Sequence, residues 1–268
     1  MKMIIFLLFF CPICCCKGQN TTDATFFAQQ PIFTNLAVAL ENPTKVYKLN
    51  LSEQALLVFP TEITQFINLR ELDLSNNQLK VIPTEIGKLV KLNDLRLSGN
   101  QIQKIPRQIG NLIQLETLWL SNNKLKKIPK ELGNLLILKS LDISENQLVT
   151  LPPQIGKLRE IKLFWASKNQ LKMLPLEIGN LNNLTHFWLL DNKLQDLPTT
   201  IGNMTHLEHL YCNNNELKSL PLEMKKLSKL QMFSIADNTR NIVVEAELYA
   251  FLEKFIDAIE LQKNVIKK

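Results

Sequence analysis

Apolar residues recur along most of the chain in a fixed pattern of 23 residues, which reads LxxLxLxxNxLxxIPxxIGxLxx. Two other markers keep the same phase. Asparagine recurs at Asn77, Asn100, Asn123, Asn146, Asn169, Asn192, Asn215 and Asn238, and proline at Pro60, Pro83, Pro106, Pro129, Pro152, Pro175, Pro198 and Pro221. Full copies begin at Val46, Leu69, Leu92, Leu115, Leu138, Ile161, Leu184 and Leu207, and a partial ninth copy begins at Leu230. Residues 46–238 are therefore predicted to form one repeat domain.

Each part of the repeat predicts a local structure. The LxL pair alternates with polar residues, which is typical of a short strand with one face turned inward. The asparagine side chain can satisfy backbone groups where the chain leaves the strand, and the proline suits the start of a short helical turn. Because one repeat cannot bury its apolar face alone, the copies are expected to stack into an elongated solenoid.

The repeat resembles that of leucine-rich-repeat proteins over about three quarters of the chain. This resemblance implies an α/β solenoid of horseshoe form, with a parallel sheet on the concave side, short helical turns on the convex side and a helical cap at each end. The segment 19–45 is expected to supply the N-terminal cap, with a helix from Phe33 to Glu41. In the segment 239–268, apolar residues at helical spacing predict an amphipathic capping helix from Glu245 to about Lys263.

The first 18 residues combine a single early lysine with a short apolar run, MKMIIFLLFFCPICCCKG, which predicts a secretory signal rather than a membrane span. The alternative is a lipoprotein signal, in which Cys14, Cys15 or Cys16 would carry the lipid. Four of the five cysteines lie in this segment, so Cys212 alone remains and no disulfide framework can form. The slot of Cys212 faces inward, which predicts a core residue rather than a reactive thiol.

The segment that leads into the repeats, NLAVALENPTKVYKLNLSEQALLVFPTEI, is similar to the entry segment of exported leucine-rich-repeat proteins of pathogenic spirochaetes, of the leptospiral type. The IPxEIGxLxxL form of the repeat is similar to theirs as well. The resemblance implies a secreted or surface-exposed bacterial protein, at the outer membrane or outside the cell, that meets host molecules. The same repeat class occurs in intracellular signalling scaffolds, and such a scaffold is the alternative if residues 1–18 are not a signal.

The charge of the chain and its lack of catalytic motifs limit the functions that the sequence supports. The formal net charge is +6, with acidic and basic residues interspersed, so we expect no nucleic-acid partner. The sequence shows no glycine-rich phosphate loop, nucleophile motif or acid/base pair, and the roughly 30 residues after Asn238 are too few for a catalytic domain. We therefore predict a non-catalytic protein without a cofactor or metal, whose one contact with a membrane would be an N-terminal lipid.

The third and fifth positions of each repeat are expected to project from the concave sheet, and their character changes near residue 160. Up to that point they hold Lys48/Asn50, Glu71/Asp73, Asp94/Arg96, Thr117/Trp119 and Ser140/Asp142. Beyond it they hold Leu163/Trp165, His186/Trp188, His209/Tyr211 and Met232/Ser234. The seventh position is serine up to Ser167 and then becomes Leu190 and Asn213. The C-terminal half of this face is therefore predicted to be apolar and aromatic, whereas Trp119 is the one aromatic residue at these two positions before it.

A large apolar patch rimmed by polar residues marks an interaction site, and tryptophan and tyrosine are favoured at interfaces. We predict that a protein ligand binds here through Trp119, Leu163, Trp165, His186, Trp188, Leu190, His209, Tyr211 and Met232. One alternative is a row of rings that only stabilises the sheet, in a structural or adhesion-supporting surface protein. Another is self-association, so the chain is expected to be a monomer or a weak dimer.

The rings of His186 and His209 are predicted to be adjacent, because they occupy the same position in successive repeats. Two neighbouring imidazoles resist being charged together, which indicates a contact that responds to pH. A shared metal ion is the second interpretation; structural zinc needs four ligands, and Asp191 and Glu208 are the candidates for the other two.

Overall fold

The computed structural model describes residues 21–238, 242–255 and 265–267, which form two units divided after Pro31. The predicted signal at residues 1–18, with its cysteines at 14–16, lies outside the described residues. The first unit contributes helix α1 (Thr21–Ala28). All remaining elements belong to the second unit, which begins at Ile32.

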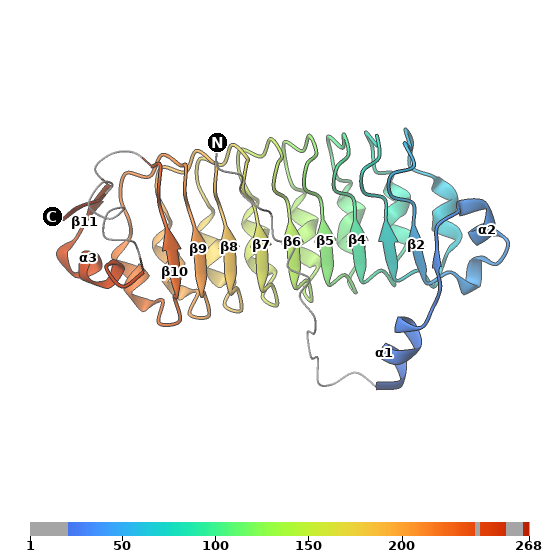
Figure 1. The fold of residues 1–268 in the computed structure, drawn as a ribbon, viewed down its shortest axis with the longest axis horizontal. Helices are drawn as coiled ribbons and strands as arrows, with labels where there is room; N and C mark the ends of the chain where they lie inside the picture. The colour runs from blue at the N-terminus through green and yellow to red at the C-terminus, as the bar shows by residue number, and fades with distance from the viewer. Residues whose placement is uncertain (1–20, 239–241, 256–264, 268) are drawn as a thin grey trace, which may run out of the picture. The chain divides into compact units, whose positions relative to one another are not determined.

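The second unit is a solenoid in which each repeat forms one coil (Figure 1). Ten of its described strands build one parallel sheet, in which each strand pairs with its neighbours in the chain. The strands are β1 (Ile32–Phe33), β2 (Lys48–Asn50), β3 (Glu71–Asp73), β4 (Asp94–Arg96), β5 (Thr117–Trp119), β6 (Ser140–Asp142), β7 (Leu163–Trp165), β8 (His186–Trp188), β9 (His209–Tyr211) and β10 (Met232–Ser234). From β2 on, each strand holds positions three to five of a repeat, which confirms the predicted solenoid with a parallel sheet.

Short 3-10 helices line the side of the solenoid opposite the sheet. They are η1 (Pro43–Lys45), η2 (Thr61–Gln65), η3 (Thr84–Lys88), η4 (Arg107–Asn111), η5 (Lys130–Asn134), η6 (Pro153–Lys157), η7 (Leu176–Asn180), η8 (Thr199–Asn203) and η9 (Leu222–Lys226). From η2 on, the repeat proline caps each helix, because its fixed φ suits a helix start. A Cβ on Gly156 would lie 2.2 Å from the carbonyl oxygen of Glu177, so glycine is what lets η6 approach η7 so closely.

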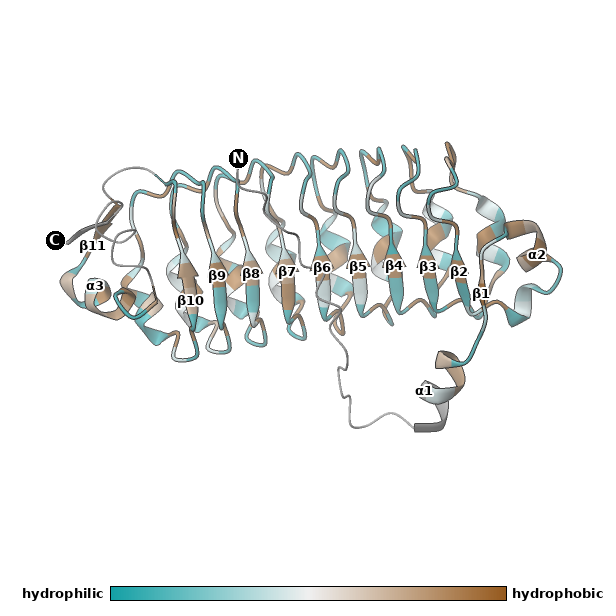
Figure 2. Cartoon of the chain, in the orientation of Figure 1, coloured by the Kyte–Doolittle hydropathy of each residue, from teal (hydrophilic) through white to brown (hydrophobic). Residues whose placement is uncertain are grey.

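The core runs the length of the solenoid between the sheet and the helices, and Figure 2 shows hydrophobic segments recurring from coil to coil. Large and small side chains are combined within it, since the buried Phe164 is followed by the small Ala166 and the buried Leu210 by Cys212. Phe164 also stacks on Phe187 of the next coil, with ring centroids 5.1 Å apart. The asparagines of the repeat are the buried polar residues of this core, from Asn77 to Asn215.

The N-terminal cap differs in extent from the sequence prediction. Helix α2 spans Leu36–Leu40, and the side chain of Asn35 accepts hydrogen bonds from the backbone nitrogens of Ala37 (2.9 Å) and Val38 (3.2 Å). The prediction that this helix starts at Phe33 is wrong, because Phe33 lies in β1 and pairs with Leu49 of β2. The chain therefore adds an edge strand to the sheet before the helix begins.

Within the described residues, the C-terminal helix ends earlier than predicted. Helix α3 spans Ala246–Leu252, and the predicted extension to Lys263 falls on residues 256–264, which lie outside the described residues, after turn residues 253–255. Leu248 and Leu252 are buried in the common core cluster, as a cap requires. The segment 239–268 is not helical throughout, since β11 (Ile242–Val244) pairs in parallel with β12 (Val265–Lys267).

Candidate interaction surface on the concave face

The parallel register aligns equivalent positions of successive repeats into rows that cross the strands. Row five, the fifth residues of the repeats, places Trp165 of β7 beside Trp188 of β8 and Trp188 beside Tyr211 of β9. Row three places Leu163 beside His186 and His186 beside His209 in the same strands. Residues that are far apart in the chain therefore meet on three adjacent strands, as their spacing predicted.

The aromatic ladder, Trp165–Trp188–Tyr211, is a continuous stack. The rings of Trp165 and Trp188 lie 4.7 Å apart with an interplanar angle of 7°, and those of Trp188 and Tyr211 lie 6.1 Å apart at 9°. Because each ring covers the face of its neighbour, the ladder presents ring edges to the concave space. All three side chains are half-buried.

The two indole nitrogens of the ladder are free to bind a ligand. No described residue accepts a hydrogen bond from Nε1 of Trp165 or Trp188, and neither nitrogen is enclosed by the protein. Indole N–H groups at interfaces usually find an acceptor on the partner. The ladder thus combines apolar edges with two donors, which suits a ligand that has both apolar groups and acceptor oxygens.

The histidine pair lies directly beside the ladder. The rings of His186 and His209 are stacked, with centroids 4.4 Å apart and an angle of 7°. Nδ1 of His186 is 3.0 Å from Oγ1 of Thr185, and Nδ1 of His209 is 3.1 Å from the hydroxyl of Tyr211. Partial burial, followed by the neighbouring His209, lowers the pKa of His186, while Glu208 opposes the shift.

Stability is expected to fall on mild acidification because of His186. A histidine whose pKa is lower in the folded state binds fewer protons than in the unfolded chain, so its stabilising contribution is present above its ordinary pKa of 6.5. That contribution is lost as pH falls from 6.5 through the lower folded pKa. Urea unfolding at about pH 7.5 and about pH 5 measures the loss, which His186→Gln should reduce. His206→Gln is the exposed control and should lose as much stability on acidification as the wild type. If His186→Gln also loses as much stability as the wild type, the assignment to His186 is wrong.

Leu190 interrupts a polar row next to the ladder. Row seven, the seventh residues of the repeats, holds Ser167, Leu190 and Asn213 in successive coils. Elsewhere in this row, Oγ of Ser121 donates to Oγ of Ser98 at 2.9 Å. On the two sides of Leu190, Oγ of Ser167 and Oδ1 of Asn213 are buried and hydrogen-bond to no described residue. Leucine therefore leaves two polar atoms unsatisfied at this place, which lowers stability.

The structure does not bring all nine predicted residues together. Trp119 is separated from the ladder, because Asp142 of β6 lies between Trp119 and Trp165 in row five. The guanidinium of Arg96 lies 4.6 Å from the centre of the Trp119 ring and covers one of its faces. Met232, at the far edge of the patch, is 41% exposed, whereas the other eight residues are half-buried.

The described residues contain no group of three or more histidine, cysteine, aspartate or glutamate side chains that could hold a metal ion. Cys212 is buried, and burial raises the pKa of its thiol, so at neutral pH it is a protonated core residue rather than a nucleophile.

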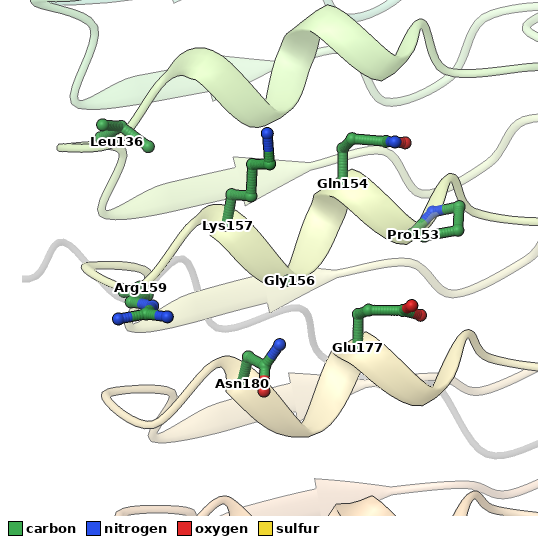
Figure 3. A pocket seen from close by; sticks show the side chains of 8 residues that line it. All are labelled: Leu136, Pro153, Gln154, Gly156, Lys157, Arg159, Glu177 and Asn180. Carbon is green, nitrogen blue, oxygen red and sulfur yellow. The ribbon is translucent and has the colours of Figure 1, made fainter.

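One surface feature was not foreseen from the sequence. A hollow of about 670 Å³ lies on the helical side, between the segments around η6 and η7 (Figure 3). It is lined by Leu136, Pro153, Gln154, Gly156, Lys157, Arg159, Glu177 and Asn180. Figure 3 shows its charged groups, Lys157, Arg159 and Glu177, spread around the rim rather than converging on one point. The hollow therefore shows no set of groups arranged for chemistry.

The comparisons agree with this architecture. A family model described as leucine-rich repeat region matches residues 107–190, and one described as leucine rich repeat matches residues 44–102. The chain is a leucine-rich-repeat protein, and its fold is that of a protein-binding scaffold. No curated protein matches its sequence. Within the described part of the chain, no helix has the length and apolar character needed to span a membrane.

Three solved structures illustrate the likeness. A leucine-rich-repeat protein of Leptospira interrogans is 28% identical over 89% of this chain and 70% of its own, with a TM-score of 0.59. A plant peptide hormone receptor, RGFR1 in complex with RGF2, is 28% identical over 84% of this chain but only 37% of its own, with a TM-score of 0.71. An internalin of Listeria monocytogenes is 25% identical over 75% of this chain and 64% of its own, with a TM-score of 0.58.

Proposed function

We propose that this chain is an exported, non-catalytic scaffold that binds a host protein on the C-terminal half of its concave face. The observation that carries the proposal is the ladder of Trp165, Trp188 and Tyr211 on three adjacent strands, with the histidine pair at its side. Large aromatic side chains concentrate binding energy at the centres of protein interfaces.

Leu190 supports a binding role over a purely structural one. A row of rings that served only the sheet would gain nothing from a leucine that leaves Ser167 and Asn213 unsatisfied beside it. Each unsatisfied buried polar atom costs about 1–3 kcal/mol. A local cost of this kind, placed next to the ladder, is expected where a surface is shaped for a ligand rather than for stability.

The relatives support the same conclusion. One of the similar structures is a plant receptor in complex with a peptide hormone, so a fold of this kind can hold a polypeptide ligand. The signal-like residues 1–18 and the resemblance to exported spirochaetal repeat proteins support export and a host ligand. Whether the N-terminus is simply cleaved or carries a lipid on Cys14, Cys15 or Cys16 is tested by fractionating cells after labelling with a radioactive fatty acid.

The function is tested by binding of the purified protein to a panel of immobilised extracellular-matrix and plasma proteins. Saturable binding to a member of the panel, weakened by ladder substitutions, is the expected result. Binding that is indifferent to every residue of the patch would place the site elsewhere. If no panel protein binds, the host-protein part of the proposal fails.

Leu190→Ser is expected to weaken ligand binding about tenfold while leaving stability unchanged or raised by up to about 1 kcal/mol. The serine hydroxyl can pair with Ser167 and Asn213, as Ser121 pairs with Ser98, and this offsets the lost apolar contact. Surface plasmon resonance and urea unfolding measure the two effects. Leu190→Ala is the matched control, because it removes the leucine without supplying a hydroxyl and should weaken binding and lower stability together. A drop in stability for Leu190→Ser equal to that of Leu190→Ala would refute this account of row seven.

A further inference from the structure

Row five contains one break in an otherwise continuous series of planar groups. From β4 to β9 the row reads Arg96, Trp119, Asp142, Trp165, Trp188 and Tyr211. Arg96 covers Trp119 on one side, and Trp165 begins the ladder on the other. Asp142 alone is neither a ring nor a guanidinium, so a carboxylate stands between two indoles.

The protein already shows how such a carboxylate and indole hold a guanidinium. Arg96 lies over Trp119 at 4.6 Å, and the same guanidinium forms two hydrogen bonds with Asp94, from Nε to Oδ1 at 3.1 Å and from a terminal nitrogen to Oδ2 at 2.8 Å. A flat cation is thus held from its face by the ring and from its edge by the carboxylate. Because Asp94 neutralises the charge of Arg96, a second guanidinium on the other face of Trp119 would not be repelled by an unpaired positive charge.

At Asp142 a carboxylate again lies next to an indole, but no cation of the described chain pairs with this carboxylate. Its Oδ1 accepts from the backbone nitrogen of Ser144 at 2.9 Å and from the Ser144 hydroxyl, and among the described residues it forms no ion pair. One oxygen, Oδ2, therefore has no hydrogen bond within the described structure. Ser140 and Ser144, the neighbours of Asp142 on the same face, are small.

The distance between Trp119 and Trp165 leaves room for one planar group between their rings. Trp119 and Trp165 are two strands apart, and neighbouring strands lie about 4.8 Å from each other, so about 9.6 Å separates the two indoles at the backbone. A guanidinium placed above Asp142 would have an indole on each face at nearly the spacing that Trp165 and Trp188 show. Lysine would fit less well, since its ammonium has no flat faces and no fork to match the carboxylate.

We propose that Trp119, Asp142 and Trp165 form an arginine-binding site for the protein ligand. This inference rests on the proposed function and refines it: the ligand carries an arginine beside the apolar group that contacts the ladder. The arginine stacks between the indoles of Trp119 and Trp165 and pairs with Oδ2 of Asp142. Trp119, which the ladder leaves out, belongs to the binding surface through this site.

The site can be tested without knowing the ligand. The chain has three tryptophans, so three indole N–H signals are expected in a ¹⁵N-correlated NMR spectrum, assigned by single substitutions to phenylalanine. The probe is the capped tripeptide acetyl-Gly-Arg-Gly-amide, compared with versions that carry lysine or the neutral isostere citrulline. We expect saturable shifts of the Trp119 and Trp165 signals that exceed the shift of Trp188, with weaker binding of lysine and none of citrulline.

Asp142→Asn is expected to raise the dissociation constant for the arginine tripeptide about tenfold or more. Asparagine can still accept from Ser144, so the fold should be kept, and unchanged chemical-shift dispersion will verify this. Asp73→Asn is the matched control, because Asp73 is a row-five carboxylate without two flanking tryptophans and should change the constant by no more than about twofold. Equal affinity for citrulline, undiminished affinity in Asp142→Asn, or shifts confined to Trp188 would each overturn the proposal.

Failure of this site and failure of the proposed function are separable. If the tripeptide does not bind but ladder substitutions still weaken ligand binding, only the arginine-binding site is wrong. If the tripeptide binds as expected while ladder substitutions leave ligand binding intact, the site stands and the assignment of the ladder to the ligand is wrong.

Discussion

Replacing Trp165, Trp188 and Tyr211 together by alanine is expected to weaken ligand binding by at least about a hundredfold. The three rings supply the apolar edges and both free indole donors of the concave patch, and no other described residue on β7, β8 or β9 can take their place. Side chains of this kind, when they are central to an interface, each contribute about 2 kcal/mol or more. Surface plasmon resonance with the panel protein that binds measures the loss.

The same triple variant should remain folded. The inward side chains of these strands, Phe164, Phe187 and Leu210, are fully buried and are left untouched. Losing the stacked pairs should lower the free energy of unfolding by about 1–3 kcal/mol. A double variant, Lys48→Ala with Glu71→Ala, is the control, since it removes a concave ion pair outside the patch. Undiminished binding would refute the claim for this face, and loss of cooperative unfolding would favour a structural role.

Asn169→Ala is expected to lower the free energy of unfolding by about 3–5 kcal/mol. The Asn169 amide nitrogen donates to the carbonyls of Ile143 (3.0 Å), Ala166 (3.2 Å) and Ser167 (3.2 Å), and its oxygen accepts from the backbone nitrogen of Leu148 (3.0 Å). These bonds join two successive coils. Alanine removes all four bonds and leaves the backbone nitrogen of Leu148 without a partner, while each of the three carbonyls keeps one other donor, so the effect exceeds that of losing one hydrogen bond.

Urea unfolding followed by circular dichroism measures this effect. Gln170→Ala is the matched control, because Gln170 is the next residue and its side chain is exposed, so its loss should change stability by less than about 0.5 kcal/mol. A similar small change for Asn169→Ala would mean that the repeat asparagine is not what joins neighbouring coils.

Much of the fold and of the candidate site was predictable because the repeat has a fixed length. A period of 23 residues sets the register between neighbouring strands, so positions three and five of each copy align without knowledge of the structure. The stacking of Trp165 on Trp188, and of His186 on His209, followed from that register alone. The burial of Cys212 followed from the inward slot it occupies.

Other features depend on side-chain packing or on short elements, and the sequence pattern does not determine them. The rings are half-buried because they cover one another, which a count of aromatic residues does not show. Arg96 over Trp119 requires particular side-chain conformations, since Arg96 could equally have turned to solvent. A two-residue strand such as β1 has no periodicity to detect, so Phe33 was assigned to the helix that follows it.

The central claim is tested most directly by site-specific crosslinking to the bound ligand. The photoreactive residue p-benzoylphenylalanine is placed at Met232, at the edge of the ladder, or at Met173, which lies outside the sheet ahead of η7. Both methionines are exposed, at 41% and 63%, so neither substitution disturbs the core. The account predicts a crosslink to the ligand from position 232 and none from position 173. A crosslink from position 173 with none from position 232 would contradict it.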